Sequence, residues 1–216
     1  MEERFDEEEL DFEFERKFFV RELPSDVREH GSVEAIVQAY LFAQDGYAVR
    51  VRLIFPDTEA PFTPFDEAVD YCGAYERRTL DSLMKQAGEE MRAVISVKSP
   101  MVTAERYEFE RELDTDVAWQ ILRRSTNMII KNRFSLWIDE DGWVFDVFGG
   151  QNEGLILAEC ERLQPVVELT IPDFCVTEVS GDLRFTNDFL SKEPWRQWRV
   201  SFENELANTK PHFLDL

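Results

Sequence analysis

The chain of 216 residues has a formal net charge of −21, and 44% of its residues are hydrophobic, so it can bury a core and is not expected to be disordered. The acidic balance argues against binding to duplex nucleic acid or to a membrane surface, and no apolar run approaches the ~20 residues of a membrane span. Three cysteines without a CxxC spacing do not indicate a disulfide framework, and two histidines do not indicate a histidine-rich metal site. The cytoplasm is therefore the expected compartment. The chain is expected to be a monomer or a homodimer.

The first predicted strand follows an acidic tail at residues 1–11. Residues 12–20 read FEFERKFFV, and this alternation of apolar and charged side chains favours a strand. Successive side chains point to opposite faces of a strand, so Glu13, Glu15 and Lys17 share one face and the phenylalanines share the other. A short helix that ends near Gly31 is expected next.

The same period of two predicts further strands along the chain. They lie at residues 32–42, 47–55, 93–99, 105–113, 128–138, 143–148 and 155–163. The turn sequences QDG at 44–46 and DEDG at 139–142 are typical of tight hairpins between neighbouring strands.

Helical spacing of apolar residues appears between and after these strands. Residues 56–92 predict a helical insertion, with a helix start at Thr63-Pro64. The segment Asp114-Thr115-Asp116 is expected to cap a helix that reaches about residue 125. The segment at 194–207 is also expected to be helical, with its tryptophans packed outside the strands. No linker or repeat is evident, so residues 12–216 are predicted to form one domain.

The charged faces of the predicted strands separate by sign. The carboxylates are Glu13, Glu15, Glu108, Glu110, Asp146, Glu159 and Glu161, and the cations are Lys17, Arg50, Arg52, Lys98, Arg106, Lys131, Arg133 and Arg184. Such faces are ordinarily solvated. A closed barrel with a polar interior and helices outside is the other interpretation. Clustered carboxylates suit a hard divalent cation and clustered basic residues suit phosphate groups, so the combination suits a metal–polyphosphate complex.

Short motifs in a fixed order resemble the CYTH superfamily, the triphosphate tunnel metalloenzymes. The motifs are FEFERKFFV at 12–20, VRVR at 49–52, ISVK at 95–98, YEFE at 107–110, KNR at 131–133, WVFDV at 143–147, GLILAECE at 154–161 and RFTN at 184–187. The resemblance implies an α+β fold with a closed eight-stranded antiparallel β-barrel, the tunnel, and helices packed outside it. The insertion at about 56–92 departs from the family, in which this connection is usually short.

The resemblance also assigns roles to individual residues. The metal ligands would be Glu13, Glu15, Glu159, Glu161 and Asp146. The substrate would be bound by Arg50, Arg52, Lys98, Arg106, Lys131, Arg133, Arg184 and Lys192. Glu108 and Glu110 would orient the basic residues. Lys17 would activate or orient the attacking water; nearby cations would lower its pKa and the glutamates would raise it, so both roles stay open.

The implied function is hydrolysis of a triphosphate with Mg²⁺ or Mn²⁺, foremost of inorganic tripolyphosphate to pyrophosphate and phosphate. Three alternatives use the same kind of binding site and stay open. They are a class IV-type adenylate cyclase, a thiamine triphosphatase and a non-hydrolytic polyphosphate- or nucleotide-binding protein.

Overall fold

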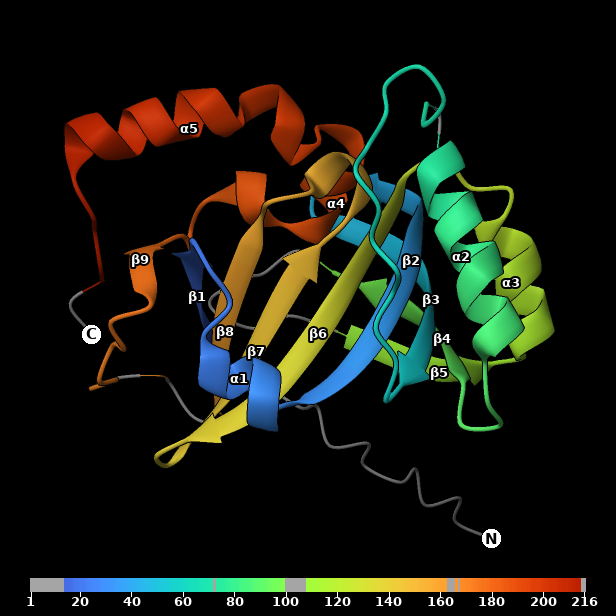
Figure 1. Ribbon diagram of the computed structural model, residues 1–216, viewed down its shortest axis with the longest axis horizontal. Coiled ribbons are helices and arrows are strands. Elements are labelled where there is room, and N and C mark those ends of the chain that lie inside the picture. The colour runs from blue at the N-terminus through green and yellow to red at the C-terminus, as the bar shows by residue number, and fades with distance from the viewer. Residues whose placement is uncertain (1–13, 72, 100–107, 163–165, 167, 215–216) are drawn as a thin grey trace, which may run out of the picture.

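One antiparallel sheet organises the molecule (Figure 1). The computed structural model describes residues 14–71, 73–99, 108–162, 166 and 168–214. The strands are β1 (Phe14–Val20), β2 (Ser32–Gln44), β3 (Tyr47–Pro56), β4 (Arg92–Lys98), β5 (Glu108–Leu113), β6 (Met128–Ile138), β7 (Asp141–Phe148), β8 (Ile156–Arg162) and β9 (Cys175–Glu178). Their order across the sheet is β5-β4-β3-β2-β6-β7-β8-β1-β9.

The strand predictions are confirmed, because each of the eight predicted segments overlaps one of the strands β1 to β8. The hairpin at residues 44–46 is also confirmed. Asp45 and Gly46 have φ angles of 51° and 82°, the left-handed conformations that a two-residue type I′ turn requires. The sequence did not predict β9, which has only four residues and lies too near a proline-containing turn to show a clear alternation.

The prediction of an α+β fold is confirmed, but the closed eight-stranded barrel is not. The sheet has nine strands, and its order ends on β5 and β9 without a pairing between them in the described part of the chain. The sheet curls strongly, so that it has an inner and an outer face (Figure 1).

The helices are α1 (Ser25–His30), α2 (Ala74–Gln86), α3 (Thr115–Leu122), α4 (Asn187–Lys192) and α5 (Trp195–Thr209), with 3₁₀ turns η1 (Gly150–Asn152) and η2 (Leu183–Phe185). The predicted cap of α3 is confirmed, because the Asp114 side chain accepts a hydrogen bond from the Val117 amide. Within the described residues, no helix is both long and apolar enough to cross a membrane.

The predicted helix start at Thr63 is wrong. Residues 61–66 have no regular structure, and a turn follows at 67–69. Aspartate side chains compete there for the backbone donors: Asp70 accepts from the amide of Asp66, and Asp66 accepts from the amide of Ala68. The helix of this region, α2, begins only after Gly73.

Two apolar clusters cover the outer face of the sheet. In one, Val37 and Val51 pack with Leu80 of α2 and Leu122 of α3. In the other, Phe18, Trp143 and other residues of β1, β7 and β8 pack with Val27 of α1. These side chains alternate with the charged ones along each strand, which leaves the charged side chains on the inner face.

A third apolar cluster closes one end of the inner face. Phe19, which shares the face of Lys17, lies with its ring centroid 5.8 Å from that of Trp195 on α5. Leu157 belongs to the same cluster and shares the face of Glu159. The expectation that the tryptophans pack outside the strands is therefore wrong for Trp195. Its helix covers the apolar end of the inner face, next to the charged side chains.

Candidate functional site

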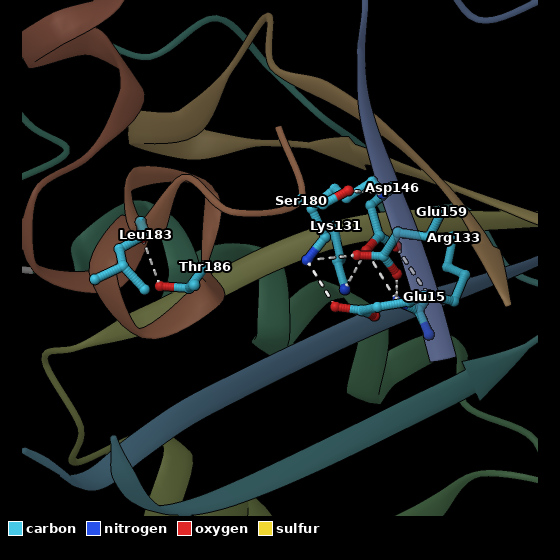
Figure 2. Close-up of polar contacts among 9 residues, drawn as sticks. Glu15, Lys131, Arg133, Asp146, Glu159, Ser180, Leu183 and Thr186 are labelled. Carbon is cyan, nitrogen blue, oxygen red and sulfur yellow. Dashed lines mark hydrogen bonds and ion pairs between the residues drawn. The ribbon is translucent and has the colours of Figure 1, made fainter. Parts of the chain in front are cut away.

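An acidic cluster forms where β1 pairs with β8 (Figure 2). The register places Glu15 opposite Glu161 and Lys17 opposite Glu159. Glu15, Glu159 and Glu161 each offer one carboxylate oxygen, and these oxygens lie within 4.8 Å of one another. Glu159 is buried, whereas Glu15 is exposed. Closely spaced carboxylate oxygens at a solvent-accessible edge fit a hard divalent cation such as Mg²⁺ or Mn²⁺.

Lys17 lies within the acidic cluster. Its Nζ is 3.0 Å from Oε1 of Glu159 and 3.4 Å from Oε1 of Glu15. Burial alone would lower the pKa of Lys17, but the carboxylates of Glu159 and Glu15 outweigh it and hold the pKa above its ordinary value. Beside these carboxylates the side chain is an ammonium ion, which can orient a ligand or a water molecule.

Asp146 of β7 holds two cations of β6 together. Its carboxylate accepts from Nζ of Lys131 at 2.5 Å and from Nε and Nη2 of Arg133 at 2.8 and 2.9 Å. Burial and the neighbouring Arg133 lower the pKa of Lys131 to about 8 despite this contact. Arg133 also approaches Glu159 at 3.5 Å, which links the cations to the acidic cluster. Asp146 thus orients the basic residues, and its predicted metal ligation stays a prediction.

Two arginines of β3 continue the basic region. Arg50 donates to Ser96 and to Glu110, both at 3.3 Å, and Ser96 donates to Glu110 at 2.5 Å. Arg52 has no hydrogen bond or ion pair to any described residue, and its Nε is buried. Burial and the charges of Arg50 and Arg133 lower the pKa of Arg52 to about 10. An arginine that is repelled by its neighbours is suited to an anion from outside the chain.

Other predicted site residues lie apart from this cluster or are not described. Arg184 pairs with Asp182 at 2.7 Å and with Glu205 at 2.9 Å. Lys192 is exposed and donates to the backbone oxygen of Ala43. Lys98 lies on β4 opposite Glu108, whose side chain is not described. Glu13 and Arg106 lie outside the described residues.

Sequence reasoning missed two polar residues near the cluster. Ser180 accepts from the backbone amide of Lys17 at 2.9 Å and donates to Glu178 at 2.7 Å, and no motif marked it. Gln38 lies on β2 between the apolar residues Val37 and Ala39 of the outer cluster. The alternation of residues 32–42 places Gln38 on the inner face, but an uncharged side chain does not by itself indicate a phosphate-binding site.

The charged inner face has two chemical halves. Carboxylates gather on β1 and β8, and arginine and lysine gather on β3 and β6. The two halves meet at Arg133 and Glu159. Such a surface can hold a polyanion on the cationic side while a bound cation neutralises charge from the acidic side.

Comparisons with known proteins point to one group of enzymes. No protein-family model matches the chain. Over 107 residues, 49% of this chain and 69% of the relative, it is 32% identical to the inorganic triphosphatase of Acetivibrio thermocellus. The crystal structure of the inorganic triphosphatase NE1496 is similar with a TM-score of 0.51 and 22% identity, over 83% of this chain and 93% of that chain. A second structure of NE1496, described as a hypothetical protein, has a TM-score of 0.50 with 22% identity, over 83% and 97% of the two chains. The structural similarity shows the fold.

Proposed function

The chain belongs to the CYTH-like triphosphatases, as its identity to the Acetivibrio thermocellus enzyme shows, and on that basis we propose that it hydrolyses inorganic tripolyphosphate to pyrophosphate and phosphate. One observation above all supports this proposal. The acidic cluster of Glu15, Glu159 and Glu161 directly adjoins the cations Lys131 and Arg133 on one face. Either cluster alone is common on a protein surface, whereas the pair matches a metal-bound polyphosphate.

The acidic cluster would hold Mg²⁺ or Mn²⁺. Glu159 and Glu161 offer oxygens from β8, and Glu15 offers one from β1. Glu13 would add a fourth carboxylate, because it is two residues before Glu15 on the same predicted strand face. The ion, when bound, neutralises phosphate charge and polarises the scissile bond. The carboxylates themselves fix its place beside the basic half of the site.

The basic residues would position the polyphosphate chain. The buried Nε of Arg52 has no hydrogen-bond acceptor among the described residues, and Arg133 is held in place by the two oxygens of Asp146. Arginine forks bind phosphate oxygens in pairs and stabilise charge that develops on a transferring phosphoryl group. Lys98 and Arg106 would extend this region, and Arg184 and Lys192 would contribute only from outside the cluster.

Lys17 would act as a fixed cation at the border between the two halves. Its ammonium group can orient the attacking water or the terminal phosphoryl oxygens, since it is held protonated by Glu159 and Glu15. We also propose that the curled sheet forms the wall of a tunnel that closes around the substrate, as the resemblance to the family implies.

A comparison of products tests the proposed reaction. The purified protein is incubated with tripolyphosphate, ATP or thiamine triphosphate, each with Mg²⁺, Mn²⁺ or EDTA, and phosphate, pyrophosphate and cyclic AMP are quantified. We expect metal-dependent release of phosphate and pyrophosphate in equal amounts, with the highest kcat/KM for tripolyphosphate. Cyclic AMP from ATP without phosphate release from tripolyphosphate would refute the proposal.

A further inference from the structure

The middle of the inner face contains a glutamine whose amide is buried without a partner. Gln38 on β2 is 0% exposed, and neither its Oε1 nor its Nε2 has a hydrogen-bond partner among the described residues. Its neighbours Val37 and Ala39 point into the outer apolar cluster, so the Gln38 side chain lies on the charged inner face. A buried amide of this kind destabilises the fold unless something else satisfies it.

A second buried polar atom without a partner among the described residues lies on the neighbouring strand β3. Arg52 is the cross-strand partner of Gln38 on β3, and within the described ranges its buried Nε also lacks an acceptor. On the other side of Gln38, β6 contributes Ile129, two residues before Lys131 on the same strand face. Gln38 therefore lies across from Arg52, whose Nε has no acceptor among the described residues, and Lys131 is two residues from its other cross-strand partner; neither of those two partners, Arg52 and Ile129, is a carboxylate.

The hydrogen-bonding capacities of Gln38 and Arg52 define the kind of ligand that would satisfy them. An arginine only donates, a phosphate oxygen only accepts, and a glutamine amide does both. A glutamine between the two can accept from Arg52 through Oε1 and donate to an anionic oxygen through Nε2. This arrangement satisfies all three buried polar atoms at once, and of the three it is Nε2 of Gln38 that requires the bound anion.

We propose that Gln38 is a further substrate-binding residue, which donates from Nε2 to a phosphoryl oxygen and accepts through Oε1 from Arg52. The inference rests on the proposed triphosphatase function and extends its binding site to β2. Glutamine suits this position because a glutamate would repel the anion and a leucine would leave Arg52 without an acceptor.

Affinity and stability together test the role of Gln38. Tripolyphosphate is titrated calorimetrically, in EDTA to prevent turnover, into the wild type, Gln38→Leu, Gln38→Glu and the matched control Gln44→Leu at the exposed end of the same strand. Thermal unfolding of each ligand-free protein is measured in parallel. We expect at least tenfold weaker binding for Gln38→Leu, weaker binding still for Gln38→Glu, and wild-type affinity for Gln44→Leu.

The stability of Gln38→Leu separates a binding role from a structural one. Because leucine removes two unsatisfied buried atoms, we expect the Tm of the ligand-free variant to equal or exceed that of the wild type. A structural glutamine satisfied by ordered water predicts a lower Tm with unchanged affinity, and this result would overturn the inference.

A measurement on the wild type covers the case in which the variants do not fold. The side-chain amide signals of Gln38, assigned in the ¹⁵N-labelled protein, should shift on addition of tripolyphosphate, and unchanged signals would overturn the inference. If the wild type hydrolyses tripolyphosphate while these signals and the Gln38→Leu affinity stay unchanged, only the role of Gln38 is refuted. If tripolyphosphate binds through Gln38 but is not hydrolysed, the role of Gln38 stands and the proposed reaction is refuted. A wild type that binds no tripolyphosphate overturns both.

Discussion

Lys17 and Lys131 are both buried on the inner face, yet their surroundings shift their pKa values in opposite directions. For Lys17, the attraction of Glu159 and Glu15 outweighs burial, and the pKa rises. For Lys131, burial and the repulsion of Arg133 outweigh the attraction of Asp146, and the pKa falls to about 8. The sequence alone could not decide whether the pKa of Lys17 is raised or lowered, because it does not give the distances from its Nζ to the surrounding charged groups.

Replacement of Lys17 tests its role as a fixed cation. We expect Lys17→Met to lower kcat/KM for tripolyphosphate by about 100-fold, the usual effect of removing one positioned donor. Lys17→Arg should retain clearly more activity than Lys17→Met, because arginine keeps the charge. Steady-state kinetics provide the measurement, and Lys85→Met, a change of an exposed residue on α2, is the control. Equal inactivity of the Arg and Met variants would instead indicate that Lys17 must release its proton.

At the scale of elements, the helix α3 depends on one side chain of the capping segment that the sequence identified at residues 114–116. The carboxylate of Asp114 accepts from the Val117 amide at 3.0 Å. We expect Asp114→Ala to lower the free energy of unfolding by about 1 kcal/mol, measured by urea denaturation, without a change in KM. Asp116→Ala, which removes a first-turn carboxylate without a capping bond, should have a smaller effect. Equal effects of the two changes would contradict the assigned cap.

Local patterns predicted the elements better than their arrangement. Strands with charged and apolar faces were predictable because alternation is a local property, and this also placed Glu159 and Arg133 on the correct face. The acidic cluster is assembled by the pairing of β1 with β8, which are distant in the chain, and only the family resemblance implied that Glu15, Glu159 and Glu161 share one site. Arg184 pairs with Asp182 and Glu205 rather than with the described cluster, and Glu205 comes from α5, whose docking no local pattern shows; its role in substrate binding stays a prediction.

At the scale of the whole molecule, a buried ion pair joins distant parts of the chain on the side of β1 opposite Lys17. Arg16 donates to Glu178 at 2.6 and 3.1 Å, and the backbone of Leu214 contacts both side chains. Burial raises the pKa of Glu178, but hydrogen bonds from Arg16, Leu214 and Ser180 outweigh it and lower the pKa. Stability from Glu178 is therefore complete above its unfolded pKa and is lost as the pH falls through the lower, folded value.

This ion pair makes the fold sensitive to acid. We expect Glu178→Gln to lower the free energy of unfolding at pH 7, and the difference from the wild type should shrink as the pH is lowered toward 4 and below. Urea denaturation across this range provides the measurement. A difference that stays constant with pH would show that the charge of Glu178 does not stabilise the fold.

Hydrolysis of tripolyphosphate by site variants links the proposed reaction to the inner face. The products are followed by ³¹P NMR with Mg²⁺ for the wild type, for Glu159→Gln, and for the control Glu89→Gln at an exposed turn. We predict equal amounts of phosphate and pyrophosphate from the wild type and the control, and a rate at least about 100-fold lower for Glu159→Gln. A wild-type rate in Glu159→Gln, or no phosphate from the wild type, would contradict the proposed site and reaction.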